Sequence, residues 1–260
     1  YGEGEIGLHA NSNLKNVVLE KEKVPLNIYN NEKSDLTLKF DEQLDAKTMS
    51  FNKLIVNSGS IKFNIPNGVE SIGFNVIEAY KVDKIETNDQ QYEINVDQLR
   101  LKHGSQLTLP RFNISGVIKS NPQSKLIVEL KATFNEDARI ELQESSLIDF
   151  GSSIVDGICK EVRLLEPESK EEKSIKLNNK KTISLICGSN DNFRCNDWKD
   201  KFVGNNELIF AKCIPNDNQI CLAATSSPET TSKNTNSKKP LSSGAIAAIV
   251  IVVIVVIAAV

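Results

Sequence analysis

The amino-acid sequence predicts an all-β fold: a parallel β-solenoid ectodomain, a small disulfide-stapled cap and a C-terminal transmembrane helix. Three observations predict it: short runs in which apolar and polar residues alternate, a motif that recurs every 19 to 21 residues, and an uncharged apolar run at the C-terminus. The expected boundaries place the solenoid in residues 1–156, the cap in 157–224, a hydrophilic stalk in 225–243 and the transmembrane helix in 244–260.

Strands are predicted between Asn16 and Phe150, where alternating runs are separated by Asn, Asp, Gly, Ser or Pro. Because successive side chains of a strand point to opposite faces, each run places its apolar residues on one face. The runs are Leu36-x-Leu38-x-Phe40, Ile61-x-Phe63-x-Ile65, Ile72-x-Phe74-x-Val76, Tyr92-x-Ile94-x-Val96, Leu107-x-Leu109, Leu126-x-Val128-x-Leu130 and Ile140-x-Leu142.

A Ser-x-Leu motif indicates an internal repeat. Its copies begin at Ser34, Ser105, Ser124 and Ser145, and the last three are separated by steps of 19 and 21 residues. A repeat of this length is typical of one coil of a solenoid, whose inward side chains stack on those of the next coil. An antiparallel β-sandwich is the alternative, because its strands recur with turn signals every ~8 to 12 residues. The near-constant step favours the solenoid.

Five cysteines, Cys159, Cys187, Cys195, Cys213 and Cys221, are candidates for disulfide bonds. The last four show a duplicated x7 spacing, which suits two local loops closed by disulfides, although spacing alone leaves the connectivity open. Paired cysteines imply an oxidising compartment. Zinc is the alternative, but the gaps exceed the ~2 to 4 residues usual for zinc ligands and no histidine lies nearby. The odd Cys159 is either free or paired outside this chain.

A cap and a stalk are expected after the solenoid. A charged stretch at 166–181 predicts an exposed hairpin or loop, and most of the cysteines and the only tryptophan, Trp198, follow it. A cap is needed because the last coil otherwise exposes apolar side chains and unpaired strand edges. Residues 225–243 are small hydroxyls, amides and charges with two prolines, which predicts either an O-glycosylated stalk or a bare linker.

The run Ala245–Val260 carries no charged or polar side chain. As a helix it would span about 24 Å, close to the ~30 Å of a bilayer core once Leu241 to Gly244 are added. We therefore expect a lipid bilayer to be a partner through residues 244–260. Two alternatives stay open: a glycolipid-anchor signal that is removed after Asn234 or Ser237, and a tail anchor whose bulk faces the cytosol, which two flanking lysines favour. The chain begins without Met and stops within this run, so we expect a fragment or processed form.

Composition and motifs argue against several functions. The net charge is −3 with interspersed signs, so no nucleic-acid partner is expected. We expect no cofactor and no metal, because no phosphate-binding loop, EF-hand loop or His pair occurs and the acidic stretch Asp191–Asp200 lacks regular calcium-ligand spacing. The chain has only two histidines, His9 and His103, and His103 stands in a turn without a nucleophile motif.

Acidic residues keep an enzymatic alternative open. Glycoside hydrolysis needs two carboxylates at a fixed separation on one face. The candidates are Glu136 with Asp137, Glu141 with Glu144, and Asp149. Glu141 and Glu144 would point to opposite faces of an extended strand, and solvated surface acids are the simpler interpretation. We therefore predict that the chain is not an enzyme.

Two further features bear on glycans. Asn113-Ile114-Ser115 is an N-glycosylation sequon, so Asn113 is the glycosylation candidate. Trp198 and Phe202 could stack on a sugar, but a tryptophan beside cysteines in a small domain is more often part of its core.

The segment from Leu99 to Ser153 resembles the coils of parallel β-helix surface proteins. The plan of β-rich ectodomain, Thr/Ser stalk and an apolar segment that begins Ser-Gly-Ala-Ile-Ala also resembles surface proteins of parasitic protists. The motifs are generic and transfer no functional residue. The resemblance and the architecture lead to the expectation of a single-pass plasma-membrane protein whose N-terminal part is extracellular and serves adhesion or binding of an extracellular protein or glycan ligand. The alternatives are a surface-attached polysaccharide-degrading enzyme and a tail-anchored structural or interaction protein.

Overall fold

A computed structural model describes residues 48–57, 59–65, 67–88, 91–165, 182–204 and 209–226 of the chain, apart from the side chain of Val82, together with the backbone of four earlier strands. All of them belong to one compact unit, Tyr1–Pro228. Nearly all of the predicted stalk and the whole predicted transmembrane segment 244–260 lie outside the described residues. Within the described ranges, no helix has the length and apolar character needed to cross a membrane.

The described part of the chain contains nineteen strands and one short helix. They are β1 (Gly4–Leu8), β2 (Leu14–Val17), β3 (Val24–Asn30), β4 (Leu36–Phe40), β5 (Thr48–Val56), β6 (Gly59–Asn64), β7 (Ser71–Ala79), β8 (Val82–Thr87), β9 (Glu93–Leu101), β10 (Gln106–Ser120), β11 (Lys125–Phe134), β12 (Arg139–Leu142), β13 (Leu147–Asp149), β14 (Ile154–Asp156), β15 (Glu161–Leu164), β16 (Thr182–Ser189), α1 (Cys195–Lys199), β17 (Phe202–Val203), β18 (Phe210–Asn216) and β19 (Gln219–Thr225).

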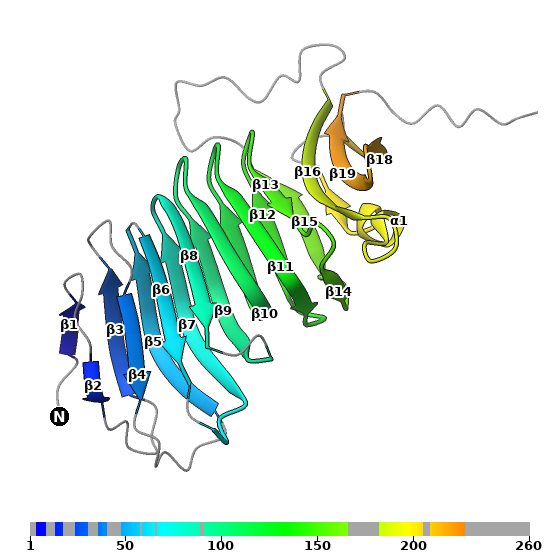
Figure 1. Cartoon of the computed structure of the whole chain (residues 1–260). Coiled ribbons are helices and arrows are strands. Elements are labelled where there is room, and N and C mark those ends of the chain that lie inside the picture. Colours follow the sequence, from blue (N-terminus) through cyan, green and yellow to red (C-terminus); the bar gives the residue numbers. More distant parts are fainter. Residues whose placement is uncertain are drawn as a thin grey trace, which may run out of the picture. The chain divides into compact units, whose positions relative to one another are not determined.

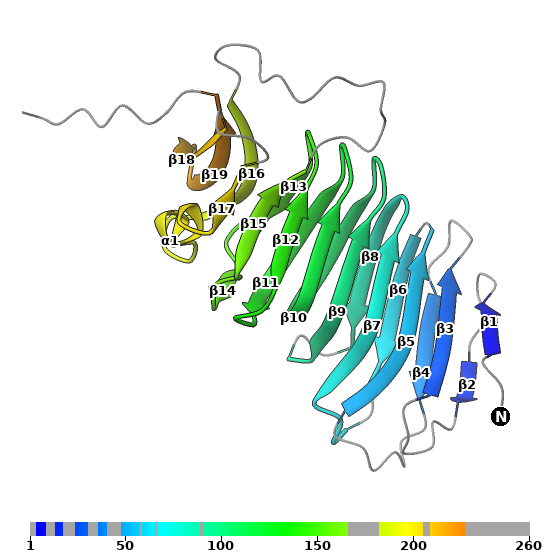
Figure 2. The ribbon, with the colours of Figure 1, turned by 180° about the vertical axis from the view of Figure 1, so that it is seen from behind.

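The strands from β1 to β17 pair in parallel with strands one coil away, so the fold is a β-solenoid of about 5 turns (Figures 1 and 2). Leu107 pairs with Leu126, and Ile72 pairs with Ile94. The predicted solenoid is therefore confirmed. The sandwich alternative is wrong, because its neighbouring strands would pair antiparallel, and such pairs occur in the described residues only among β16, β18 and β19.

Each coil has three sides, which we name by their strands. Side A holds the first halves of β5, β7 and β9, then residues 111–114 of β10, 131–134 of β11, and β14. Side B holds the second halves of β5, β7 and β9, then residues 117–120 of β10, followed by β12, β15 and β17. Side C holds β6, β8, residues 106–109 of β10, 125–128 of β11, then β13 and β16.

The corner between sides A and B shifts the alternation of side chains by one residue. In β7, Phe74 is buried, Asn75 at the corner is exposed, and Ile77 is the next buried apolar side chain. Val76 was predicted to share the inward face with Phe74, and the structure instead places it on the outer side. At the corner between sides C and A, Leu130 of β11 is likewise only half-buried. A period of two holds only within a straight strand, so it fails where the chain bends.

The Ser-x-Leu motif has a structural cause. Ser105, Ser124 and Ser146 are each about 1% exposed and precede the strands of side C. The Ser146 hydroxyl donates to the carbonyl oxygen of Gln143 at 2.7 Å, which closes the turn between sides B and C. The Ser124 hydroxyl donates in the same way to the carbonyl oxygen of Asn121, whereas the buried Ser105 hydroxyl has no hydrogen-bond partner in the described part of the chain.

The last copy of the motif, at Ser145, was placed one residue too early. The register pairs Leu126 with Ile148, so the equivalent serine is Ser146 rather than Ser145. The step is therefore 22 residues instead of 21. The inward side chain, Ile148, is fully buried, whereas Leu147 is partly exposed.

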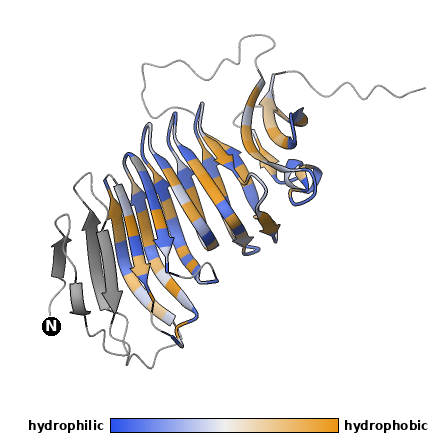
Figure 3. Cartoon of the chain, in the orientation of Figure 1, coloured by the Kyte–Doolittle hydropathy of each residue, from blue (hydrophilic) through white to orange (hydrophobic). Residues whose placement is uncertain are grey.

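Inward side chains form apolar ladders along most of the solenoid, and hydrophobic and polar residues alternate along its strands (Figure 3). Each fully buried Leu or Ile stabilises the fold by about 1.5–3 kcal/mol. Side B shows the most regular ladder, whose members are all 0% exposed: Leu54, Ile77, Leu99, Ile118, Ile140 and Val162.

A small cap follows the last coil. β16 continues side C in parallel, and Ile148 pairs with Ile186. More residues separate Ile148 from Ile186 than separate paired residues of the earlier coils. The reason is the charged segment 166–181, which lies between them in the sequence and outside the described residues. β19 then pairs antiparallel with both β16 and β18. Trp198 packs its ring 4.9 Å from that of Phe134 and, at 2% exposure, belongs to the core that joins cap and solenoid.

Candidate functional site

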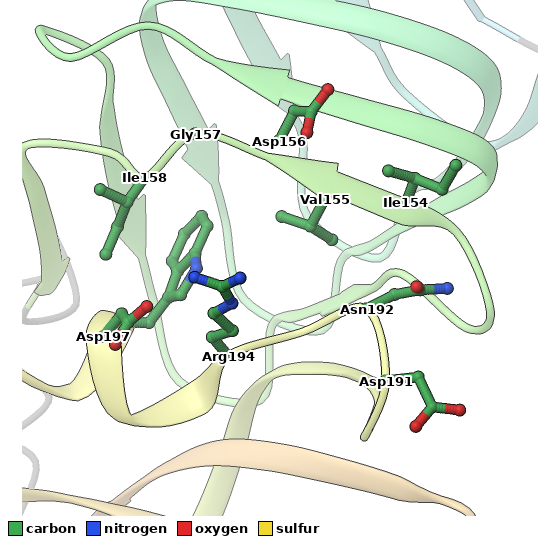
Figure 4. Close-up of a pocket in the computed structure, with 10 residues that line it drawn as sticks. Ile154, Val155, Asp156, Gly157, Ile158, Asp191, Asn192, Arg194 and Asp197 are labelled. Carbon is green, nitrogen blue, oxygen red and sulfur yellow. The ribbon is translucent and has the colours of Figure 1, made fainter.

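A pocket of about 440 Å³ lies where the last solenoid coil meets the cap (Figure 4). Its volume falls within the ~300–1,000 Å³ range of small-ligand sites. One wall is the segment from Ile154 to Ile158, and the other is part of the segment from Asp191 to Trp198. The lining residues are Ile154, Val155, Asp156, Gly157, Ile158, Asp191, Asn192, Arg194, Asp197 and Trp198.

In the solenoid wall of the pocket, the backbone of Gly157 lies close to the backbone of Phe134. This glycine has a φ of +73°, and a Cβ at this position would overlap with the carbonyl oxygen of Phe134 on the preceding coil. Only glycine fits both requirements. The close contact sets the path of the chain between Asp156 and Ile158, both of which line the pocket. Ile154 is 53% exposed and supplies an apolar edge.

The cap wall is fixed from several directions. The Asn192 amide nitrogen donates to the carbonyl oxygen of Ser152 at 2.8 Å, which ties the wall to the solenoid. Cys195 is bonded to Cys213, and the neighbouring Phe193 and Trp198 are 1% and 2% exposed. A wall held in this way is preformed, so little ordering is required when a ligand binds.

The pocket carries charges of both signs. Asp156 forms an ion pair with Lys131 at 2.6 Å. Arg194, Asp191 and Asp197 are exposed, and none of them forms an ion pair within the described part of the chain. Arg194 extends from the cap toward the strand that carries Val155 (Figure 4). The lining therefore offers hydrogen-bond donors and acceptors together with the apolar side chains of Ile154, Val155 and Ile158.

The acidic residues weighed for hydrolysis are not brought together. Glu141 lies on side B and pairs with Lys119 at 3.1 Å, whereas Asp137 lies in the turn before β12 near Lys160. Asp149 lies on side C and pairs with Lys125 at 3.0 Å.

The ionisation of Asp149 also argues against an acid catalyst. Burial acts to raise the pKa of Asp149, but Lys125, the Gly151 amide and Gln219 hold it below its usual value. A general acid needs a raised pKa at neutral pH. Asp137, Glu141 and Asp149 thus lie in different parts of the coil, each beside a lysine, and the enzymatic alternative gains no support from them.

The remaining predicted residues are placed as follows. His103 is exposed in the turn between β9 and β10, and His9 lies outside the described residues. Glu136 is exposed in the turn before β12. In the described ranges no three His, Cys, Asp or Glu residues are grouped so that they could hold a metal ion.

Disulfide bonds are present, but the two local loops suggested by the spacing are wrong. Cys187 is bonded to Cys221, and Cys195 is bonded to Cys213, so one bridge is nested inside the other. The reason is strand pairing: β16 and β19 lie antiparallel with Cys187 directly opposite Cys221. Cys159 is free and buried, and burial raises the pKa of its thiol to about 12, so it stays protonated.

Asn113 lies within β10 on the outer face of side A. Its amide nitrogen donates to the Asn95 side-chain oxygen at 3.1 Å, and Ser115, the third residue of the sequon, hydrogen bonds to the Asp97 carboxylate. The side-chain nitrogen of Asn113, to which a glycan would be attached, is thus hydrogen-bonded in the unmodified chain. Glycosylation at Asn113 stays a prediction.

Sequence reasoning did not predict the pocket, although it noted the acidic stretch that contains Arg194 and Asp197. The two walls are separated by more than thirty residues in the sequence, with the charged segment 166–181 between them. No local pattern connects Asp156 with Arg194, so only the fold brings them together. No protein-family model, no curated protein and no solved structure was found to match the chain.

Proposed function

We propose that the chain is a single-pass cell-surface protein that presents its β-solenoid for adhesion or ligand binding. In this proposal the solenoid and cap face the extracellular space, residues 225–243 form the stalk, and residues 244–260 anchor the protein in the plasma membrane. The observation that carries the proposal is the pair of nested disulfides, because such bonds persist in oxidising compartments and are rare in the cytosol.

The geometry of the cap supports a binding role. The pocket is preformed, as ligand sites commonly are, and it is lined by charges of both signs. The solenoid beneath it is held by ladders of buried side chains, which gives the pocket a rigid base. An extracellular protein or glycan is the proposed partner.

The full chain expressed in cells tests this proposal. Intact cells are treated with a membrane-impermeant biotin reagent, and the recovered protein is alkylated with and without prior reduction before its mass is measured. We expect labelling of intact cells and four cysteines that react only after reduction. Labelling only in permeabilised cells, together with reduced thiols, would contradict the proposal and indicate a tail-anchored cytosolic protein.

Adhesion is measured on the same cells. Cells that display the chain are expected to attach more strongly to matrix-coated surfaces or to other cells than cells that display an unrelated stalked protein. Equal attachment on every surface would remove adhesion and leave ligand binding as the proposed role.

A further inference from the structure

Side B carries more cations than carboxylates on its outer face. Its outward side chains form two rows that run from coil to coil, one in register with Glu78 and the other with Gln98, and Lys102 follows the end of β9. The charged members are six cations and three acids, which we call the side B charges: Lys53, Arg100, Lys102, Lys119, Arg139 and Arg163, and Glu78, Glu141 and Glu161. In the described residues this face is therefore positive, although the net charge of the whole chain is −3.

In each ion pair that the described residues form on side B, the acid is the more buried partner. The side chain of Glu78 is 5% exposed, against 28% for Lys53 and 39% for Arg100. The same order holds in two further pairs, with 22% for Glu141 against 50% for Lys119, and 20% for Glu161 against 49% for Arg163. A ligand that approaches side B therefore meets ammonium and guanidinium groups before it meets a carboxylate.

Two of the cations have no acidic partner in the described part of the chain. Arg139 is exposed at the start of β12, and Lys102 places its ammonium nitrogen 5.6 Å from the centroid of the Tyr80 ring. Tyr80 is itself 39% exposed. The donors of Arg139 and Lys102 are thus available to an anion, and the ring beside Lys102 offers a face against which a sugar can pack.

Sides A and C do not show this arrangement. On side A the lysine is the more buried partner, because the Lys131 side chain is 27% exposed and that of Asp156 is 55% exposed. The pair of Lys125 and Asp149 on side C has the order of side B, at 34% and 22%. The described charges of side C and of the corner that follows it are nevertheless balanced in number: Lys62, Lys84 and Lys125, and Glu86, Glu129 and Asp149.

We propose that side B binds an extended anionic glycan, whose sulfate or carboxylate groups contact the side B cations while Tyr80 packs against one sugar ring. This inference rests on the ligand-binding role proposed above and names the class of ligand. The cations recur from β5 to β15. With coils about 4.8 Å apart, they extend over about 24 Å along the axis. An elongated ligand with repeated negative charges can contact most of them at once.

Side B lacks the apolar centre that a protein partner would need. Protein interfaces usually combine an apolar core with a polar rim. Of the described large apolar side chains that are exposed, Tyr80 and Val203 lie on side B, on β7 and β17, and the charged strands β9, β10, β12 and β15 lie between them. A glycan requires no such core, because its hydroxyls and anionic groups bond directly to polar and charged side chains.

Calorimetric titration of the full chain in nanodiscs of zwitterionic lipid tests the inference. The probes are a heparin dodecasaccharide and dodecagalacturonate. Maltododecaose is the neutral control, and dodecaglutamate and a DNA dodecamer are anionic controls that are not glycans. We expect at least one anionic glycan to bind at least tenfold more tightly than every control, and its binding to weaken as salt is raised. A control that binds within tenfold of the better anionic glycan, or no binding by either glycan, would overturn the inference.

A double variant tests whether the ligand lies on side B. Lys102→Gln with Arg139→Gln removes two cations that hold no ion pair in the described residues, and should lower the affinity for the anionic glycan at least tenfold. Lys62→Gln with Lys212→Gln is the matched control, because both lysines are exposed outside side B and the net charge changes equally. It should change the affinity less than twofold. Thermal unfolding confirms that each variant is folded, and equal losses of affinity contradict the assignment.

Lysine footprinting tests the same assignment on the unmodified chain. With the anionic glycan bound, an amine-acetylating reagent should modify Lys53, Lys102 and Lys119 more slowly, while the rates at Lys62 and Lys84 on side C stay unchanged. Mass spectrometry of the proteolytic peptides measures these rates. Unchanged rates at the three lysines of side B would show that the glycan binds elsewhere.

The outcome is distinguishable from failure of the proposed function. A chain that is labelled at the cell surface but binds no anionic glycan removes this inference and leaves the surface role intact. A chain that binds an anionic glycan through side B but is labelled only after permeabilisation does the opposite.

Discussion

Asp83 stands in register with Leu107 of the next coil, so a carboxyl group occupies a position that apolar side chains fill in the following coils of side C. Asp83 is 3% exposed. One carboxylate oxygen accepts a hydrogen bond from the Lys81 amide at 3.3 Å, and the other is buried without a partner. Burial raises the pKa of Asp83 to about 6.

The raised pKa predicts that the solenoid loses stability as pH rises from about 4 to about 6, because the folded chain then binds the proton that the unfolded chain has released. Asp83→Asn removes this effect. At pH 7.5 the variant should be more stable by on the order of 2 kcal/mol, and at pH 4 the two chains should be equal. Urea unfolding at four pH values measures this, and the exposed Asp137→Asn is the control. A constant difference across the pH range would contradict the prediction.

Glu78 bridges consecutive coils on side B. Its carboxylate lies 3.2 Å from the Lys53 ammonium and 3.0 Å from the Arg100 guanidinium, and its side chain is 5% exposed. Burial acts to raise the pKa of Glu78, but Lys53, Lys102 and Arg100 hold it below its usual value. This contribution to stability is present above the unfolded pKa and is lost as pH falls through the folded pKa.

Glu78→Gln should therefore destabilise the chain by about 1–2 kcal/mol at pH 7, and the loss should fade under acidic conditions. Glu141→Gln is the matched control on the same row, because Glu141 has a single, half-exposed lysine partner. It should change the free energy of unfolding by less than about 1 kcal/mol. An equal loss of unfolding free energy in both variants would show that the burial of Glu78 does not strengthen its ion pairs.

Substitutions at Gly157 and Gly104 distinguish the effect of steric overlap on stability from the effect of backbone strain. Both have positive φ angles, +73° and +69°, but a Cβ would meet the Phe134 carbonyl only at Gly157 and would meet nothing within 4 Å at Gly104. Gly104→Ala should destabilise the chain by about 1–2 kcal/mol through strain alone. Gly157→Ala should exceed this by about 2 kcal/mol and also change the pocket. Thermal unfolding measures both, and similar losses would refute the close approach at Gly157.

The nested disulfides predict a specific peptide map. Proteolysis without reduction should release peptides that link Cys187 to Cys221 and Cys195 to Cys213, while Cys159 reacts with a thiol reagent only after denaturation. Replacing Cys187 and Cys221 together by Ser should lower the free energy of unfolding by about 3–4 kcal/mol. Cys159→Ser leaves both links in place and serves as the control. Links between Cys187 and Cys195 would contradict the fold of the cap.

Much of the solenoid could be predicted because its signal is local. Alternation within a strand reports which side chains are buried, as it did for Ile72 and Phe74. The Ser-x-Leu step reported the coil length because a buried serine recurs in each of these turns between sides B and C, and in two of them its hydroxyl bonds to a carbonyl of the turn. The burial of Asp83 could not be predicted in this way, because an acidic residue in an alternating run is normally assigned to the outer face.

Positions that depend on neighbouring coils could not be predicted. The outward turn of Val76 follows from the corner at Asn75, and the pairing of Cys187 with Cys221 follows from β19 lying against β16. The pocket joins Asp156 to Arg194 across the segment 166–181. Burial preferences and turn chemistry act over a few residues and are therefore visible in the sequence. Register, disulfide partners and the ligand-facing surface arise from contacts between distant segments, which exist only once the coils have stacked.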